Sequence, residues 1–334
     1  MVNRNGITID RSSANKILVI GDIMLDQYII GQAKRLCPEA PVPILEPEET
    51  SYYLGGAANV AANIRSMGGR VILAGVVGKD EEGERIRKIL KQEDIPAVLG
   101  VDASRPTTVK QRVGTREQLV VRLDRELARD IPSGIFHDIL RLVTVLMDDV
   151  SLVAVSDYGK GVVTAELMAA VCEICRPKGI PVLVSPTGRN FAKYKGADVI
   201  MSDSSTLEAL YGKEIRNDDD LEKAVAAVFT NTDCSACIMT WESNGAVLFH
   251  SPREWIQYPC DTRRDSTYLS GAGDVFMAGL AMGISMGQPL GTVCRMANEL
   301  VSATIGEVGT MVAEADDWNR IRIGFGSGDP INSG

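Results

Sequence analysis

The feature that most limits the possible folds is a regular alternation of short apolar runs with helical patterns. Residues 16–21 form a continuous, β-branched-rich run, which is typical of a strand buried on both faces. From about residue 136 to residue 305, helical and extended patterns follow one another in turn. Strands that alternate with helices at this spacing predict an α/β fold, a doubly wound and mostly parallel sheet.

The expected elements follow from periodicity and from glycine or proline breaks. The expected strands are 16–21, 71–77, 107–113, 118–123, 152–156, 182–185, 199–201, 236–240 and 246–250. The expected helices are 57–67 (opened by residues 55–59), 81–92, 136–147, 164–175, 206–211, 221–229, 271–283 and 290–305.

A small β-sheet lid is predicted outside this alternation. Residues 28–53 read as short extended pieces broken by Pro38, Pro41, Pro43 and Pro47. Residues 107–113 and 118–123 alternate as a hairpin. We expect a single domain over residues 1–334, with a lid formed by about 28–54 and 107–124. Because lid strands leave an apolar face, a homodimer joined through the lid is expected.

Composition narrows the possible partners and the location. A chain of 334 residues, 45% of them hydrophobic, can bury one large α/β core. Its net charge of -9 argues against nucleic acid or an anionic membrane as the main partner. There is no apolar run of transmembrane length and no signal-peptide core at the start. A cytoplasmic location is therefore expected.

Two cysteine pairs have metal-ligand spacing, Cys172 with Cys175 and Cys234 with Cys237. A zinc site is the less favoured interpretation, because the first pair lies on an apolar helix face and neither pair has a glycine-rich knuckle. The seven cysteines are expected to be free thiols, and no protein-bound metal is predicted. With only His137 and His250 in the chain, histidine-based catalysis is not expected.

The strongest candidate for chemistry is residues 270–274, followed by the apolar run 275–283. The small residues Gly271, Ala272 and Gly273 leave backbone N–H groups uncovered at the start of a buried helix, which makes an anion site. Asp274 stands in the first turn and could accept a proton from a hydroxyl group. An anion hole beside a base is suited to phosphoryl transfer to an alcohol. The alternative is a plain loop and N-cap of a core helix.

Five motifs occur in the order typical of one family. They are 21–28 (GDIMLDQY), 38–43 (PEAPVP), 54–61 (LGGAANVA), 156–161 (SDYGKG) and 271–274 (GAGD). On these motifs the chain resembles the ribokinase-like sugar kinases, or PfkB family, over about residues 16–312. Within that family it is most similar to the D-glycero-β-D-manno-heptose 7-phosphate kinases of the ADP-heptose pathway, which are often fused to a nucleotidyltransferase.

The resemblance implies a sugar-binding side. Asp26 would bind sugar hydroxyls, Gly55 and Gly56 would let the backbone approach the sugar, and Asn59 would offer a donor and an acceptor. Cations near the sugar would hold its distant phosphate. The candidates for the sugar phosphate are Lys110, Arg112 and Lys160, and Asp157, just before the loop that holds Lys160, is a further candidate for substrate binding. The alternatives are a plain strand-to-helix turn for the glycines and ordinary solvated charges for the cations.

A nucleotide side is implied in the same way. Thr240, Gly245 and Asn298 match positions that line the ATP pocket in the family, with Asn298 near the adenine. Asp203 could supply negative charge for Mg²⁺, which commonly needs one or two carboxylates besides water and the nucleotide phosphates. Core or cap packing explains these residues equally well from sequence. The expected cofactors are ATP and Mg²⁺, and the expected product is heptose 1,7-bisphosphate.

The chain departs from the family on the nucleotide side. The family's Asn-x-x-Glu falls on Asp203 and Thr206, and its Asp-Pro-Lys falls on residues 185–187 (SPT). Tyr268 replaces the aspartate that helps to bind a monovalent cation. A working kinase is the favoured interpretation, with a sugar-phosphate-binding or regulatory protein that has lost transfer as the alternative. A nucleoside or fructose-phosphate kinase of the same fold is a third possibility.

Overall fold

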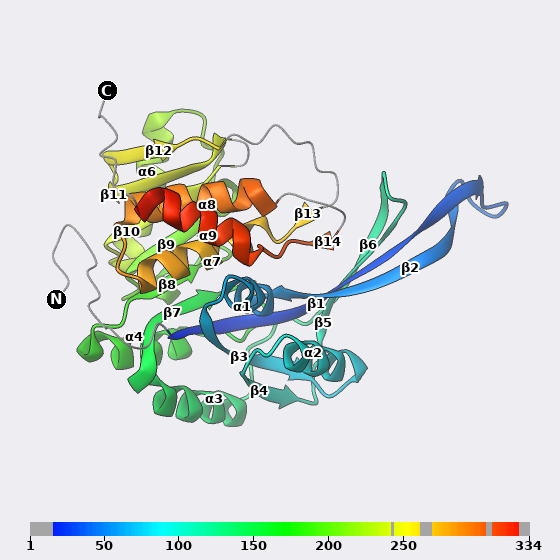
Figure 1. The fold of residues 1–334 in the computed structure, drawn as a ribbon, viewed down its shortest axis with the longest axis horizontal. Helices are drawn as coiled ribbons and strands as arrows, with labels where there is room; N and C mark the ends of the chain where they lie inside the picture. Colours follow the sequence, from blue (N-terminus) through cyan, green and yellow to red (C-terminus); the bar gives the residue numbers. More distant parts are fainter. Residues whose placement is uncertain (1–15, 242–243, 261–268, 305–308, 327–334) are drawn as a thin grey trace.

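The computed structural model describes residues 16–241, 244–260, 269–304 and 309–326. Its main feature is one twisted sheet of twelve strands (Figure 1). The central path runs β12-β11-β10-β9-β8-β7-β1-β3-β4, and β2, β5 and β6 branch from β1. The strands are β1 (Lys16–Leu36), β2 (Pro43–Gly56), β3 (Arg70–Gly78), β4 (Ala97–Asp102), β5 (Thr108–Gly114), β6 (Leu119–Arg125), β7 (Val150–Ser156), β8 (Val182–Ser185), β9 (Val199–Asp203), β10 (Ala236–Thr240), β11 (Ala246–Ser251) and β12 (Glu254–Tyr258).

Along the central path the strands are parallel from β4 to β10 and antiparallel from β10 to β12. Outside this path, β2 is antiparallel to β1 and β6 is antiparallel to β5. Within β1, Ile17 and Val19 belong to one hydrophobic core, whereas Leu18 and Ile20 belong to another. Successive side chains of a strand point to opposite faces, so the continuous apolar run is buried on both sides. The predicted doubly wound α/β class is confirmed.

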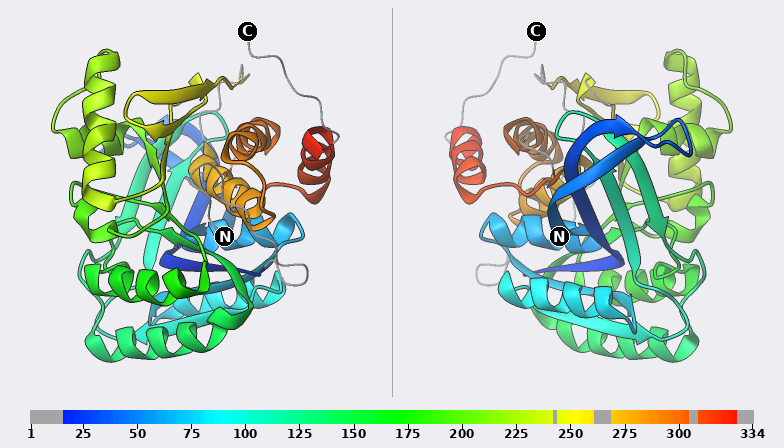
Figure 2. Two further views of the ribbon diagram at one scale, coloured as in Figure 1. Left: turned by 90° about the vertical axis from the view of Figure 1, so that its left-hand side faces the viewer. Right: turned by 90° about the vertical axis from the view of Figure 1, so that its right-hand side faces the viewer.

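Helices cover both faces of the sheet (Figure 2). Buried side chains of α1, α2, α7, α8 and α9 fill the core on one face, and those of α3, α4, α5 and α6 fill the core on the other. The helices are α1 (Ala57–Ser66), α2 (Glu81–Gln92), α3 (Ser133–Leu146), α4 (Ala165–Lys178), α5 (Ser204–Tyr211), α6 (Asp218–Thr232), α7 (Ala272–Ser285), α8 (Leu290–Thr304) and α9 (Ala315–Gly326). None of the helices in these described ranges is long and apolar enough to cross a bilayer.

The lid region differs from the expected short pieces. Strand β1 continues from the central sheet to Leu36, and β2 runs beside it from Pro43 to Gly56. The prediction of broken segments was wrong. Within the described ranges β2 pairs only with β1, so it is an edge strand. An edge strand tolerates proline, and Pro47 pairs with Gly31 at a register shift. The hairpin predicted at 107–123 is formed by β5 and β6, which gives the order β2-β1-β5-β6.

Strands β4, β12, β13 (Leu269–Ser270) and β14 (Gly309–Thr310) and helix α9 were not expected. Strands β4 and β12 lie at opposite edges of the central sheet, and α9 follows the short parallel pair of β13 and β14. An edge strand has a neighbouring strand on one side only, and its other side faces solvent. It therefore lacks the long apolar run that identifies a central strand. Strand β12 illustrates this, with Glu254, Trp255, Ile256 and Gln257 all exposed.

Candidate active site

The buried helix α7 starts where the chain makes a left-handed turn. Gly271 is the N-cap residue, with a φ of 96°, and a Cβ added there would lie 2.7 Å from Asn59 Nδ2. A residue with a side chain would therefore be strained and would displace Asn59. At Gly273, by contrast, an added Cβ would meet nothing within 4 Å. The first turn of α7 thus faces open space with uncovered N–H groups, as an anion site requires.

Asp274 lies in this first turn and is buried. Its Oδ2 accepts a hydrogen bond from Asn59 Nδ2 at 3.0 Å, and its Oδ1 accepts one from the Tyr158 hydroxyl at 2.8 Å. Burial raises the pKa of Asp274 to about 7, the charge of Asp26 adds to this, and the two hydrogen bonds act in the opposite direction. A carboxyl group that titrates near neutral pH is suited to accept a proton from a hydroxyl.

Asp26 lies close enough to act on Asp274 electrostatically and is part of a polar network of its own. Its Oδ1 accepts a hydrogen bond from Arg112 at 2.9 Å, and its Oδ2 accepts one from the Thr310 hydroxyl at 2.9 Å. Thr310 is in turn 3.2 Å from the Ser270 hydroxyl, which is 2.8 Å from the Tyr28 hydroxyl. The predicted sugar ligand therefore joins lid strands β1 and β5 to the chain that leads into α7.

Asn59 is held by the helix that the glycine pair opens. Gly56 has a φ of 58°, and a Cβ there would lie 2.5 Å from the Asp22 carbonyl oxygen. A Cβ on Gly55 would lie 2.9 Å from Asp26 Oδ2, so this backbone passes close to the carboxylate. Asn63, one turn after Asn59, donates to Asn59 Oδ1 at 3.2 Å. This contact fixes which end of the Asn59 amide faces Asp274.

The loop that follows β7 is anchored by Asp22. The Asp22 carboxylate accepts hydrogen bonds from the backbone N–H groups of Tyr158, Lys160 and Val162, at 2.8, 3.0 and 3.2 Å. Burial, together with the charge of Asp157, raises the pKa of Asp22 to about 6, although these three donors lower it. Asp22, which follows the first apolar run, therefore fixes the position of this loop rather than facing an open pocket.

The predicted phosphate ligands on the lid side are each paired with an acid. Lys110 lies 3.6 Å from Asp124, and Lys160 lies 2.7 Å from Glu126. Lys110 and Arg112 lie two residues apart on β5, and Lys160, in the loop after β7, reaches Glu126 just after β6. Their role in binding a phosphate stays a prediction, and a bound phosphate would compete with the acids for them.

Asp157 points elsewhere. Its Oδ2 accepts from the Tyr194 hydroxyl at 2.8 Å and pairs with Lys193, while its Oδ1 accepts from the Gly159 backbone N–H at 2.8 Å. The structure therefore does not bring this carboxylate to Asp26, Asn59 and Asp274, because its hydrogen bonds hold the base of the loop. Its assignment to substrate binding stays a prediction that these contacts do not support.

The nucleotide-side residues gather around the ends of β9 to β12. Asp203 and Thr240 are paired in register at the ends of β9 and β10. Asp203 caps α5, since its Oδ1 accepts from the Thr206 N–H at 2.7 Å. A Cβ on Gly245, whose φ is 87°, would lie 2.1 Å from the Tyr258 carbonyl oxygen, which accepts from Asn298 at 2.7 Å. Tyr258 therefore links the two predicted ligands Gly245 and Asn298.

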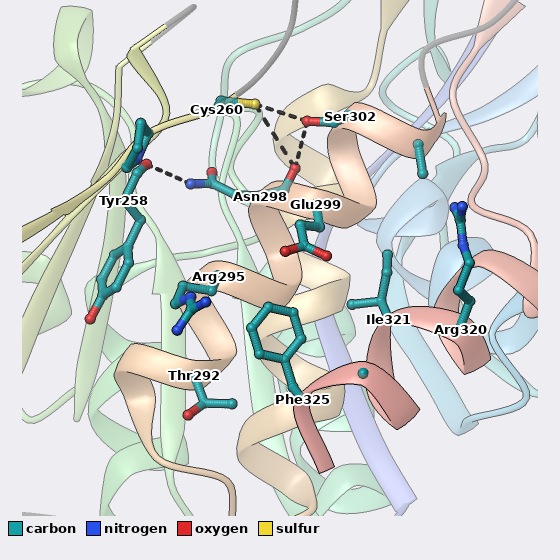
Figure 3. Close-up of a pocket in the computed structure, with 13 residues that line it drawn as sticks. Tyr258, Cys260, Thr292, Arg295, Asn298, Glu299, Ser302, Arg320, Ile321 and Phe325 are labelled. Carbon is teal, nitrogen blue, oxygen red and sulfur yellow. Dashed lines mark hydrogen bonds between the residues drawn. The ribbon is translucent and has the colours of Figure 1, made fainter. Parts of the chain in front are cut away.

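A cavity of about 1010 Å³ lies on this side, between α8, α9 and the end of β12 (Figure 3). Asn298 and Arg295 reach it from α8, Phe325 from α9, and Cys260 from the segment after β12. The lining mixes apolar and aromatic side chains, such as Ile321 and Phe325, with polar and charged ones, such as Arg295, Glu299 and Arg320. Tyr268, the residue that departs from the family's cation site, lies outside the described residues.

Sequence reasoning missed Tyr158, Thr310 and Asn63. Tyr158 stands inside the SDYGKG motif, so its place between two predicted ligands was the available signal. Thr310 and Asn63 carried no local signal. Thr310 reaches Asp26 across 284 residues of sequence, through the pairing of β13 with β14.

Comparison with solved structures identifies the class of fold. Phosphofructokinase-2 from Escherichia coli, in complex with potassium, has a TM-score of 0.74 and 18% identity, with 94% of this chain and 99% of that chain covered. Arabidopsis thaliana ribokinase, complexed with ribose and ATP, has a TM-score of 0.69 and 17% identity, with 92% and 98% covered. At these identities the likeness concerns the fold, which is ribokinase-like.

The family follows from sequence. Residues 14–317 match the pfkB family of carbohydrate kinases, so the chain belongs to that family and is a phosphotransferase. Proteins named bifunctional protein HldE from Geobacter sulfurreducens and Helicobacter hepaticus are 36% and 35% identical to it, over 95% and 90% of the chain. These matches cover 65% and 62% of the relatives. The chain therefore spans less than two thirds of their length. The family expected from the motifs is confirmed.

Proposed function

We propose that this carbohydrate kinase transfers the γ-phosphoryl group of ATP to a hydroxyl of a phosphorylated sugar. The observation on which the proposal rests is the position of Asp274, a buried acid in the first turn of α7 with Asn59 on one oxygen and Asp26 nearby. Asp274 would accept the proton of the acceptor hydroxyl. The N–H groups of residues 271–274 would stabilise the charge on the transferred group.

The acceptor is proposed to be heptose 7-phosphate, and the product heptose 1,7-bisphosphate. This choice is supported by the sequence motifs at 21–28 and 38–43. Asp26 and Asn59 would hold the sugar hydroxyls. Lys160, with Lys110 and Arg112, would hold the 7-phosphate once it replaces their present acidic partners.

ATP would enter from the side of Asn298, and Mg²⁺ would come with its phosphates. No group of three or more His, Cys, Asp or Glu that could hold a metal lies within residues 16–241, 244–260, 269–304 and 309–326. Asp203, exposed at the end of β9, fits a cation that takes one carboxylate besides water and phosphate oxygens. When bound, Mg²⁺ would neutralise charge on the β- and γ-phosphates.

A transfer assay with ATP, Mg²⁺, K⁺ and heptose 7-phosphate tests the proposal. We expect turnover by the wild type and a loss of roughly 10²–10⁴-fold in Asp274→Asn, the scale of general base catalysis. Sugar phosphate binding by the variant, measured by calorimetry, should be retained. Fructose 6-phosphate in the same assay checks the acceptor. Absence of turnover with every acceptor, together with sugar phosphate binding but no ATP binding, would instead favour a binding protein that has lost transfer.

A further inference from the structure

One contact of the candidate base is not explained by sugar or nucleotide binding. The Tyr158 hydroxyl donates to Asp274 Oδ1 at 2.8 Å, on the oxygen that Asn59 leaves free. A carboxylate oxygen can accept two hydrogen bonds, so an acceptor hydroxyl can still bind beside Tyr158. The carboxylate is thereby held from both ends, by an amide from α1 and by a phenol from the loop after β7.

Tyr158 is more exposed than an aromatic residue of the core. Tyr158 as a whole residue is 39% exposed, although its hydroxyl reaches a buried acid. Packing of the ring is therefore a weak reason for its position. The hydroxyl itself is buried against Asp274, and this burial, followed by the charge of Asp274 and then those of Asp26 and Asp203, raises the pKa of the Tyr158 hydroxyl well above its usual value. It stays protonated and remains a donor.

The backbone around Tyr158 is fixed independently of Asp274. Asp22 accepts the N–H groups of Tyr158, Lys160 and Val162, and Asp157 accepts that of Gly159. Four hydrogen bonds to two buried acids thus set the direction in which the ring leaves the loop. A donor on so constrained a backbone can fix the orientation of the group it contacts.

We propose that Tyr158 is a positioning residue, whose hydroxyl fixes the Asp274 carboxylate and stabilises its charged form for proton transfer. The inference rests on the proposed function, in which Asp274 is the base. Asp26 from β1 and Asp203 from the end of β9 are the other acids that act on this pair, and Asn59 is its second donor. Loss of the hydroxyl leaves the buried carboxylate with Asn59 alone among these donors.

The test is a titration that needs no turnover. Carbon-13 NMR of protein labelled at the aspartate carboxyl groups follows Asp274, whose signal is assigned by its loss in Asp274→Asn. In Tyr158→Phe we expect the midpoint of Asp274 to rise by about one pH unit, the scale of a hydrogen bond to a charged acceptor. Tyr194→Phe is the matched control, because Tyr194 donates to Asp157 at the base of the same loop. There the midpoint of Asp274 should not move.

Turnover gives a second readout. In Tyr158→Phe, kcat should fall roughly tenfold or more and the acid limb of its pH profile should shift upward, with KM for the sugar little changed. Combined with Asp274→Asn, the change should cost nothing further. An unmoved Asp274 midpoint in Tyr158→Phe, or an equal shift in Tyr194→Phe, would overturn the inference. Absence of wild-type turnover alone would count against the proposed function, because the titration does not depend on it.

Discussion

At the scale of single residues, burial destabilises the charged form of the candidate base Asp274. Asp274 has its pKa raised from 3.8 to about 7, mainly by burial. The folded protein therefore holds this proton more tightly than the unfolded chain does. The cost of the charged form is absent below about pH 4, grows from there to pH 7, and is complete above pH 7.

This loss of stability with rising pH leads to a prediction for Asp274→Asn. At pH 8 the variant should be more stable than the wild type, by up to roughly 4 kcal/mol, while at pH 4 the two should be similar. Asparagine can keep both contacts, because its oxygen accepts from Asn59 and its amide can donate to the Tyr158 oxygen. Thermal denaturation at the two pH values measures the difference. Equal differences at both values would mean that Asp274 titrates as an ordinary acid.

The residues of the candidate site were predictable where they lie in short motifs. Asp274, Asn59 and Asp26 were all named from sequence, and the structure joins the first two by a hydrogen bond and places the third close enough to act on them. Partners such as Thr310 were not predictable, because pairing of distant segments brings them in. The orientation of Asp157 was not predictable either. A carboxylate in a glycine-rich loop can bind a ligand, or it can accept hydrogen bonds from the protein groups that hold the loop.

At the scale of elements, the start of α7 presents two glycines with different constraints. At Gly271 a side chain is excluded by the φ of 96° and by Asn59, whereas at Gly273 there is open space. The open space is where the phosphates of ATP would approach the N–H groups. Glycine at 271 is therefore required by the fold, whereas glycine at 273 would be required only by a bound phosphate.

We expect Gly271→Ala to lower stability by roughly 1–3 kcal/mol, the cost of a strained left-handed residue. Gly273→Ala should not lower stability, and should raise it slightly because alanine favours a helix, but it should raise KM for ATP roughly tenfold or more, because the methyl group would crowd a phosphate. Sugar phosphate binding should be intact in Gly273→Ala. Denaturant unfolding and steady-state kinetics give the two measurements. Wild-type ATP kinetics in Gly273→Ala would show that the phosphates do not reach this turn.

Elements with a continuous or alternating apolar pattern were predicted well, and those governed by pairing were not. Helices α1 and α2 and strands β7 and β8 match the expected ranges within about two residues. The length of β1 and β2 was missed, because prolines that exclude a central strand are tolerated in an edge strand. Strand β12 was missed because most of its residues are exposed.

At the scale of the whole molecule, the lid presents apolar side chains to solvent. Val121 and Leu123 of β6 share one face by the period of two, and both are exposed. Among the residues that the structure describes, β6 pairs only with β5, so its outer edge is not paired by any of them. Natural proteins cover such edges and faces. We therefore propose that a second copy of the chain covers the lid.

Leu123→Asp tests the lid contact. The wild type should behave as a dimer and the variant as a monomer in size-exclusion chromatography with light scattering, because a charge on this face would have to be buried. Val145→Asp on α3 is the matched control, since Val145 is more exposed than Leu123 but belongs to a helix of the central body. A monomeric wild type, or dissociation by both changes alike, would contradict a dimer through the lid.

The continuity of β1 limits how the lid can move. The same strand pairs with β3 and β7 in the central sheet up to about Asp22 and then with β2 and β5 in the lid (Figure 1). There is consequently no loop between body and lid in which a hinge could be placed on this strand. Any closure over a substrate must twist β1 near residues 21–24, five residues or fewer from Asp26. Motion at the distant tip of the lid would then rotate the backbone of Asp26, whose carboxylate is the proposed sugar ligand.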